Sequence, residues 1–334
     1  MIPNQRVSHT DNVPALLREL KATLLVSTYE NNALWAIGAN RIQHIPMSRP
    51  TGIAVQGHQL ALAGRNKITE FVNIPEAVDR NEKWKERDAI YFMRSTLHTG
   101  FIDAHEIAYG DAGLICVNTA FSCLSTTQDI HNFVPRWSPK HISELLPEDR
   151  CHLNGVAMNK GRAEIVTAFG LTDSYEGWRE GKHTNGVMLD VKSDEVLVSG
   201  LSMPHSPRFH DSTLYVLESG LGRLLRVDWR SGDTQIVATL PGYARGMTCY
   251  GNLAFIGLSQ QRDEPGERKS GVWIIDLRDG STFGWIEFLG EVTEVFDVAL
   301  LPASNPEFVD DSCAEWETIF LLPQLRKEPQ LLAA

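Results

Sequence analysis

Apolar residues in this chain come in short runs separated by polar turns. One arrangement recurs six times: an apolar strand start, a second apolar strand after a tight turn, and then further strand-like runs. The copies begin at Thr51, His105, Asn154, Ser206, Arg245 and Phe296. Their spacing of roughly 40–50 residues is typical of β-propeller blades. The pattern therefore predicts an all-β, six-bladed β-propeller.

Strand-like runs at both ends of the chain indicate how the ring closes. The runs at 24–29 and 33–37 precede the first copy and flank a polar turn, which suits a hairpin. We expect them to be outer strands of a blade whose inner strands come from 296–302 and 318–322 near the C-terminus. Such closure removes free sheet edges.

The expected domain organisation is simple. Residues 23–326 form one propeller, residues 1–22 a tail or a short helix at 13–21, and residues 327–334 a C-terminal tail. The charged insertion at 74–88 is expected to be a solvated helix. In a simple meander, the long loops 127–153, 169–185 and 259–270 lie at the end of the channel where the inner strands begin.

The overall composition of the chain limits the kinds of partner that the protein is expected to bind. The formal net charge of −11 argues against nucleic-acid binding, which needs a basic face, and weakly against an anionic membrane surface. No apolar run approaches the roughly 18 residues of a membrane span, and residues 1–20 have no signal-peptide core. Five cysteines without metal-site spacing fit reduced thiols, so a cytoplasmic protein is expected.

Polar residues occupy five of the six aligned strand starts, where side chains should surround the channel mouth. His105 occupies one start, and His205 directly precedes another on a different blade. Thr51 and Asn154 occupy two more. We expect the two histidines to be catalytic and Thr51 and Asn154 to bind substrate.

The next aligned position holds small or rigid residues in four copies, but Glu106 and Asp297 in the other two. A carboxylate in a crowded position must find a cation or hydrogen-bond donors, or else become neutral. Two interpretations stay open for Glu106: a structural bond to a neighbouring backbone or arginine, or a catalytic acid or base.

Arginines and tryptophans near the same end complete the predicted site. An arginine cluster in an acidic protein favours capture of a carboxylate, phosphate or sulfate, although ion pairing between blades is the alternative. Trp137 and Trp178 lie on long loops, where a tryptophan either covers a ligand or anchors its loop. The expected substrate-binding residues from these two groups are Arg65, Arg208, Arg245, Trp137 and Trp178.

Cofactor motifs are scarce. No glycine-rich phosphate loop, dinucleotide fingerprint, GxSxG elbow or HExxH motif occurs, so no nucleotide cofactor is expected. The pattern permits a divalent metal held by His105, His205 and one carboxylate from separate blades.

Three motifs, PEDRCHLNG (147–155), GLSMPHSPR (200–208) and LPGYARG (240–246), resemble those of a family of bacterial conserved hypothetical proteins described as a domain of unknown function. The segment at 271–277 is also similar, and the resemblance covers about 24–302. It implies a β-propeller and marks these loops. A looser similarity to gluconolactonase-like and strictosidine-synthase-like propellers is architectural, because their metal-binding Glu/Asn/Asp pattern has no residue-by-residue match here.

Two functions are compatible with this sequence. The first is an enzyme that acts on a small polar, anionic metabolite at the channel mouth by acid/base chemistry, of lyase, isomerase or cyclase type. In this hypothesis Arg245 and Arg208 bind the anion, and His105 acts as general acid or base, with Glu106 orienting it or sharing its proton. The second is a non-catalytic propeller that binds a protein or peptide, which predicts an exposed apolar face and few converging titratable groups.

Overall fold

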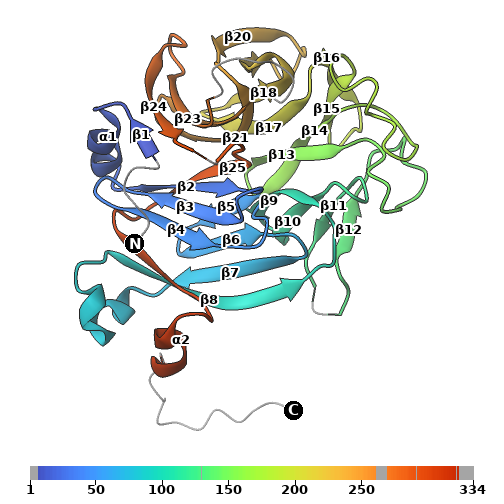
Figure 1. The fold of residues 1–334 in the computed structure, drawn as a ribbon. Helices are drawn as coiled ribbons and strands as arrows, with labels where there is room; N and C mark the ends of the chain where they lie inside the picture. The colour runs from blue at the N-terminus through green and yellow to red at the C-terminus, as the bar shows by residue number, and fades with distance from the viewer. Residues whose placement is uncertain (1–6, 129, 261–268, 291, 321, 323–334) are drawn as a thin grey trace.

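The computed structural model describes residues 7–128, 130–260, 269–290, 292–320 and 322. Six sheets, each built on a four-stranded antiparallel meander, surround a central channel, and two of them carry a fifth strand. Figure 1 shows the inner strands β5, β9, β13, β17, β21 and β25 arranged around that channel. The predicted six-bladed, all-β propeller is confirmed.

Each blade is named here by its inner strand. The β5 blade contains β5 (Ile53–Gln56), β6 (Gln59–Ala63), β7 (Lys67–Asn73) and β8 (Ala89–His98). The β9 blade contains β9 (Ala104–Gly110), β10 (Gly113–Asn118), β11 (Cys123–Thr126) and β12 (Val134–Trp137). The β13 blade contains β13 (Leu153–Asn159), β14 (Arg162–Ala168), β15 (Gly186–Asp190) and β16 (Val196–Leu201).

The remaining blades follow the same plan. The β17 blade contains β17 (Pro204–His210), β18 (Thr213–Glu218), β19 (Arg223–Val227) and β20 (Thr234–Thr239), with the short 3₁₀ helix η4 (Ser219–Leu221) between β18 and β19. The β21 blade contains β21 (Tyr243–Tyr250), β22 (Leu253–Ser259), β23 (Gly271–Asp276) and β24 (Thr282–Phe288). The β25 blade contains β25 (Asp297–Leu301), β2 (Thr23–Thr28), β3 (Ala33–Ile37) and β4 (Ile42–Pro46).

The β25 blade closes the ring. Strand β25 pairs antiparallel with β2, with Ala299 opposite Leu25, so the C-terminal part of the chain supplies the inner strand and the N-terminal part supplies the outer three. The predicted second C-terminal strand at 318–322 is wrong, because Thr318 ends helix α2 (Ala314–Thr318) and residue 321 lies outside the described residues. The four strands of this blade leave no inner edge for another strand.

Two short strands extend the sheets in a way that the sequence pattern did not predict. Strand β1 (Val7–His9) pairs antiparallel with β24, and β26 (Pro306–Val309) pairs parallel with β8. Glu307 of β26 binds Arg41 at 2.9 Å and Arg87 at 2.7 Å. Both additions cover outer edges that would otherwise expose unpaired backbone groups. The expected tail at 327–334 lies outside the described residues.

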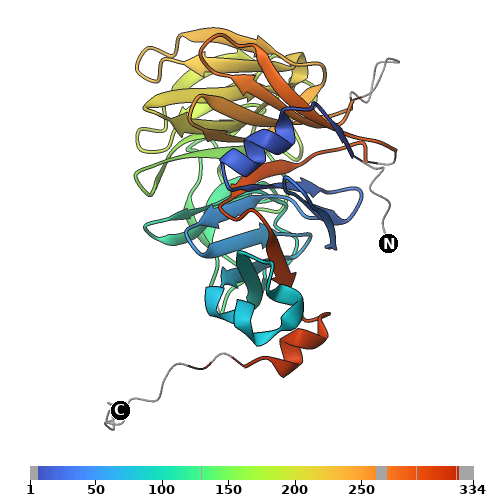
Figure 2. The same ribbon diagram turned by 90° about the vertical axis from the view of Figure 1, so that its left-hand side faces the viewer.

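Helices are few and peripheral. Figure 2 shows helix α1 (Val13–Glu19) from the side, at the edge of the propeller. Its Val13 and Leu17 are buried against the β21 and β25 blades. The insertion at 74–88 forms two 3₁₀ helices, η2 (Pro75–Arg80) and η3 (Glu82–Trp84), rather than one solvated helix. Trp84 anchors this segment by packing edge-on against Phe92 with ring centroids 5.7 Å apart.

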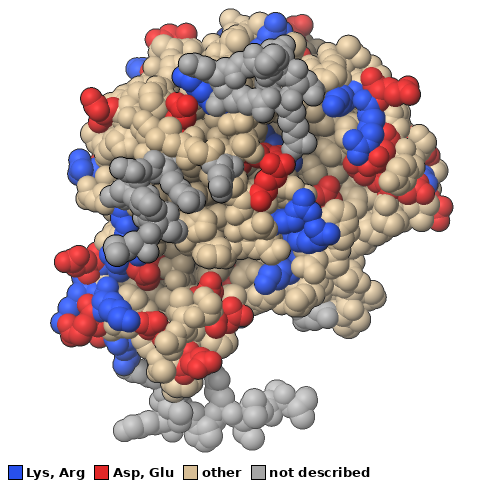
Figure 3. All heavy atoms as spheres, viewed as in Figure 1, with Lys and Arg blue, Asp and Glu red and all other residues tan. Residues whose placement is uncertain are grey.

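The surface of the insertion is charged, and helix α2 lies beside it. Figure 3 shows acidic and basic side chains intermixed over the viewed face, densely so at this corner of the molecule. Lys83 of η3 and Glu315 of α2 form an ion pair of 3.0 Å. Within the described ranges no helix is long and apolar enough to cross a bilayer.

The hydrophobic core lies between neighbouring blades. Val26 and Trp35 of the β25 blade pack in one cluster with Phe255 and Ile274 of the β21 blade. Every residue of β2, β3 and β23 is buried, whereas the outermost strands β4 and β20 are partly exposed. Because a middle strand meets an adjacent blade on each face, it is a continuous apolar run rather than an alternating one.

Gly246 lies where β21 and β25 approach each other closely. A Cβ atom at this position would lie 2.6 Å from Asp297 Cα, and the backbone φ is +77°. Gly246→Ala is therefore expected to lower the free energy of unfolding by about 2–4 kcal/mol, through steric overlap and a left-handed backbone. Gly251→Ala is the matched control, because φ is +54° there and the space is open. It should cost about 1 kcal/mol. Equal losses for the two variants in urea unfolding would contradict this packing account.

Candidate functional site

All six inner strands run in the same direction, so the channel has two different ends. The strands begin at the end called here the entry end and finish at the far end. A residue with positive φ stands two positions before the aligned polar residue in four blades. The pairs are Arg49 with Thr51, Asp103 with His105, His152 with Asn154, and Met203 with His205.

The repeated positive φ shows that the predicted alignment of strand starts is wrong by one residue at the β17 blade. His205, not Ser206, is equivalent to His105, because Nδ1 of each ring lies about one hydrogen-bond length from the carbonyl two residues earlier: 3.1 Å to Asp103 O and 3.0 Å to Met203 O. The pairing of β17 with β18 shifts between His205 and Arg208, and this irregularity displaces the pattern by one residue.

Imidazole and aromatic rings form a continuous chain across the entry end. The ring centroids of His105 and His152 are 4.8 Å apart, those of His152 and Phe169 are 4.4 Å apart, and those of Phe169 and His205 are 5.2 Å apart. Phe296 extends the chain, with its centroid 5.3 Å from that of His105. These rings, together with Asp149, Trp178 and Arg245, are called the entry-end cluster.

Asp149 and His152 form a hydrogen-bonded pair within this cluster. Asp149 Oδ2 lies 2.8 Å from His152 Nδ1 and accepts a second hydrogen bond of 3.1 Å from Trp178 Nε1. The Trp178 ring packs on His152 with centroids 4.3 Å apart. Burial raises the pKa of Asp149 to about 7. The carboxyl group therefore titrates near neutral pH, where proton-transfer catalysis is most effective.

The three imidazoles are neutral at pH 7. Burial lowers the pKa of His105 to about 4 and that of His152 to about 3, and it lowers the pKa of His205 well below its ordinary value. Each Nδ1 faces an oxygen atom, so the hydrogen-bond network favours a proton on Nδ1 in the neutral rings of His105 and His205. Within the described ranges, the Nε2 atoms of the three rings have no hydrogen-bond partner and are free to accept from a ligand.

Arg245 adds a guanidinium group to the cluster, over the ring of Phe296. Its Cζ atom lies 3.4 Å from the Phe296 ring centroid, and Nη1 lies 3.5 Å from a carboxylate oxygen of Glu294. The contact between Arg245 and Glu294 joins two blades, which agrees with the alternative that the arginines form ion pairs between blades. Nη2 is buried without a hydrogen-bond partner among the described residues. Burial lowers the pKa of Arg245.

Other buried polar atoms at this end also lack partners among the described residues. They are Thr51 Oγ1, Asn154 Nδ2 and Asp149 Oδ1. Asn154 uses only its Oδ1 atom, which accepts a hydrogen bond of 2.7 Å from Thr167. Because buried polar groups in folded proteins are nearly always hydrogen-bonded, these atoms point to bound water or a polar ligand. The side chains of His152, Asp149 and Arg245 are 13%, 19% and 15% exposed, so solvent reaches the cluster.

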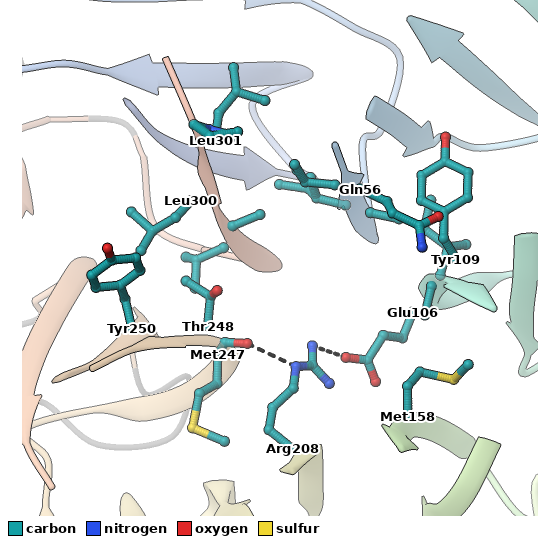
Figure 4. Close-up of a pocket in the computed structure, with 18 of the residues that line it drawn as sticks. Gln56, Glu106, Tyr109, Met158, Arg208, Met247, Thr248, Tyr250, Leu300 and Leu301 are labelled. Atoms are coloured by element: carbon teal, nitrogen blue, oxygen red, sulfur yellow. Dashed lines mark hydrogen bonds and ion pairs between the residues drawn. The ribbon is translucent and has the colours of Figure 1, made fainter. Parts of the chain in front are cut away.

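Glu106 and Arg208 lie deeper in the channel and bind each other, as the dashed lines in Figure 4 show. Arg208 also donates to Met247 O at 3.0 Å, and Glu106 Oε2 accepts from Val156 N at 2.7 Å. These contacts agree with the first interpretation of Glu106, a structural bond to a neighbouring backbone group or arginine. The expectation that it orients His105 is wrong, because the Nδ1 atom of that ring faces Asp103 instead.

Asp297 has a similar structural role on the β25 blade. Its carboxylate accepts from Ile53 N at 2.9 Å and from Val298 N at 2.8 Å. Burial raises the pKa of Asp297 to about 7. Burial acts to lower the pKa of Arg208, but Glu106 and Asp297 raise it above its ordinary value. The three residues form a charged layer across the middle of the channel, called the central layer.

A cavity of about 500 Å³ lies beyond the central layer, toward the far end. Glu106 and Arg208 line it, whereas His105, Asn154, His205 and Arg245 are not among its lining residues. These predicted site residues are thus divided between the entry end and the central layer, which faces the far-end cavity. Arg208 cannot join Arg245 around one anion, because backbone carbonyls and Glu106 already hold its guanidinium group.

The remaining predicted site residues have different surroundings. Trp178 is buried in the entry-end cluster, where it supports His152 and Asp149 from one side. Arg65 is exposed, with Cζ 5.8 Å from the Phe101 ring centroid. The prediction that Trp137 covers the ligand is wrong, because this residue lies on the outer strand β12 and packs against the core cluster of the β9 and β13 blades. In the loop at 259–270, residues 261–268 lie outside the described residues.

Sequence reasoning did not single out Asp149, His152 or Phe169 for the site. Asp149 and His152 stand three residues apart in the PEDRCHLNG motif, and both have positive φ, at 47° and 52°. A closely spaced Asp and His before an aligned strand start was the available signal. The suggested metal ligands find no support, since among the described residues no group of three or more His, Cys, Asp or Glu side chains could hold a metal ion.

Comparison with solved structures shows the same fold. A chain from a nidogen/laminin complex superposes with a TM-score of 0.54 at 12% identity, covering 84% of this chain and 99% of that one. A protein of unknown function from Bacteroides caccae gives a TM-score of 0.55 at 11% identity with the same coverage. At such low identities the similarity concerns the fold alone. No curated protein shows significant sequence similarity to the chain.

A family match is more specific, because it depends on sequence and extends from helix α1 to strand β26. Residues 11–309 match the family described as Domain of unknown function (DUF4915), and this span includes all six inner strands, the entry-end cluster and the central layer. The chain belongs to the DUF4915 family.

Proposed function

We propose that the entry end of the channel is the active site of an enzyme that acts on a small polar, anionic metabolite by proton transfer. The observation that carries this proposal is the hydrogen-bonded pair of Asp149 and His152, which lies in one cluster with two further imidazoles and a guanidinium group. Proton transfer of this kind is a step in many lyase, isomerase and cyclase reactions.

Substrate binding in this proposal relies on Arg245. Its Nη2 atom supplies a donor for a carboxylate, phosphate or sulfate, and the Phe296 ring holds the guanidinium plane in place. Asn154 Nδ2 and Thr51 Oγ1 are further buried polar atoms that lack a protein partner in the described part of the chain. A ligand that bonds to them would satisfy groups whose burial is otherwise costly.

The proton-transfer step follows from the Asp149–His152 contact. His152 Nε2 accepts a proton from the substrate, and the Nδ1 proton stays in its hydrogen bond to Asp149. The ionised carboxylate stabilises the imidazolium that forms, which makes an otherwise weak base effective. His152 is the proposed catalytic residue, Asp149 is a positioning residue that acts through it, and His105 and His205 accept hydrogen bonds from the substrate.

A protein or peptide ligand is the second candidate, favoured by exposed apolar side chains on the loops of the entry end. Phe101, Leu171, Tyr175, Leu221 and Leu289 are between 45% and 69% exposed. They lie on loops from four blades around the mouth, where a bound chain could contact several of them. Binding of a protein or peptide does not need the titratable groups that converge inside the channel mouth. The enzyme proposal is therefore preferred.

Arg245→Ala is expected to weaken binding of the anionic ligand about 10–100-fold, because a charge-assisted hydrogen bond contributes about 1.5–3 kcal/mol. The ligand would first be identified by thermal-shift screening of anionic metabolites, and its affinity then measured by calorimetry. Arg226→Ala is the matched control, since Arg226 is exposed on β19 and bonds to Gln235. If the parent and both variants bound the ligand with equal affinity, the proposal that Arg245 binds its anionic group would be wrong. If no metabolite bound and an apolar peptide did, the second candidate would replace the first.

A further inference from the structure

The cavity at the far end is separate from the proposed active site. Its lining includes the last residues of the inner strands, among them Gln56, Tyr109, Met158, Phe209, Tyr250 and Leu301, so every blade contributes. Its volume of about 500 Å³ lies within the range of small-molecule sites. Figure 4 shows the labelled side chains distributed around the cavity, with the Glu106–Arg208 pair at its base.

The walls of this cavity are mainly apolar. Ile53, Val55, Ile107, Val298 and Leu300 line it, and Gln56, Thr248 and Tyr250 add polar groups. Gln56 and Tyr250 are exposed, which places them at the opening. An ordered water molecule needs two to four polar partners, so such walls favour an apolar occupant over water.

The base of the cavity is polar but close to neutral. Arg208 Nη1 donates to Val156 O at 3.3 Å and Pro207 O at 2.9 Å, Nε donates to Met247 O, and Nη2 contacts Glu106. A guanidinium group has five N–H bonds, and these contacts use four. Arg208 lines the cavity with a side chain that is 24% exposed, and the N–H that these contacts leave unused belongs to Nη2.

We infer that the far-end cavity is a second binding site, for a small and mostly apolar molecule that carries one uncharged hydrogen-bond acceptor such as a carbonyl or ether oxygen. The acceptor meets the free N–H of Arg208 while the apolar body fills the space between the strand ends. An anionic group fits less well, because Glu106 already neutralises Arg208 and would repel a second carboxylate. A cationic group would face the guanidinium itself.

The central layer makes the two sites independent. Glu106, Arg208 and Asp297 are tied to backbone groups of several blades, so a molecule at the far end has no contact with Arg245 or His152. The inference therefore does not depend on the proposed function, and its test can fail or succeed separately.

The test uses the neutral fluorescent ketone 6-propionyl-2-(dimethylamino)naphthalene, which carries one carbonyl acceptor and whose emission shifts to shorter wavelength in apolar surroundings. The parent protein is expected to show saturable binding. Thr248→Trp, which fills the cavity from β21, should weaken binding at least tenfold, and Gln56→Trp at the exposed opening should weaken it as well. Thr234→Trp, at an exposed position on the outer strand β20, is the matched control and should bind like the parent. Arg245→Ala should also leave probe binding unchanged.

Competition identifies the chemical class. At neutral pH, 2-octanone is expected to displace the probe at lower concentrations than octanoate, because the ketone offers an acceptor without a charge. Circular dichroism checks that each variant is folded, and Gln56→Trp serves if Thr248→Trp does not fold. The inference is overturned if the parent shows no saturable signal, if the folded cavity variants bind like the parent, or if octanoate is the better competitor.

Discussion

Arg208→Met is expected to lower the free energy of unfolding by about 3–5 kcal/mol, because it leaves the buried carboxylate of Glu106 without its cation. Glu106 is 4% exposed and lies at the same level of the channel as Asp297, so the loss of one guanidinium group affects two carboxylates. Urea unfolding followed by tryptophan fluorescence measures the effect.

The double variant Glu106→Leu with Arg208→Met distinguishes this cause from a loss of packing. When both partners of a buried ion pair are replaced by apolar groups of similar volume, the outcome is often close to neutral. The double variant should therefore be more stable than Arg208→Met alone. A double variant that is less stable than the single one, or a single variant within about 1 kcal/mol of the parent, would contradict the role of Arg208 in compensating the buried charge of Glu106.

Asp149→Asn is expected to lower turnover by about 10²–10⁴-fold once a substrate is known, which is the usual effect of removing a group that supports general acid/base catalysis. Asparagine keeps the shape of the side chain and tolerates the positive φ of 47° at this position, so the fold should be retained. It cannot carry the negative charge that stabilises a protonated His152.

The pH dependence of turnover separates this role from a purely structural one. Because burial raises the pKa of Asp149 to about 7, turnover of the parent should rise as the pH increases through about 7 and the carboxyl group loses its proton. Asp149→Asn should lack this rise. A variant that retained both the rate and the pH profile of the parent would exclude Asp149 from the mechanism.

The architecture was predictable because it depends on periodic features of the chain. Strand starts such as Asn154 and Arg245 recur at blade spacing, and the apolar hairpin at 24–37 needed an inner strand that only the C-terminal part could supply. The strand expected at 318–322 failed because a short apolar run does not show whether a sheet edge is available. Strands β1 and β26 were missed because each spans three or four residues and depends on an edge formed elsewhere.

The site was only partly predictable, because its chemistry depends on contacts between blades. His105, His205 and Arg245 do meet in one cluster, as their aligned positions indicated. The partner of Glu106 is Arg208, about one hundred residues later in the sequence, and no local pattern indicates that pairing. Asp149 acquires its raised pKa from burial in this cluster, which outweighs the lowering effect of the Trp178 hydrogen bond and which a sequence does not display.

The location of a bound anionic metabolite tests the central claim most directly. A crystal structure of the protein with the tightest-binding anionic metabolite from the thermal-shift screen would give that location. The account predicts the anionic group within hydrogen-bond distance of Arg245 Nη2, and another polar atom of the ligand next to His152 Nε2. A ligand bound in the far-end cavity or on the outer strands, with Arg245 and His152 untouched, would contradict it.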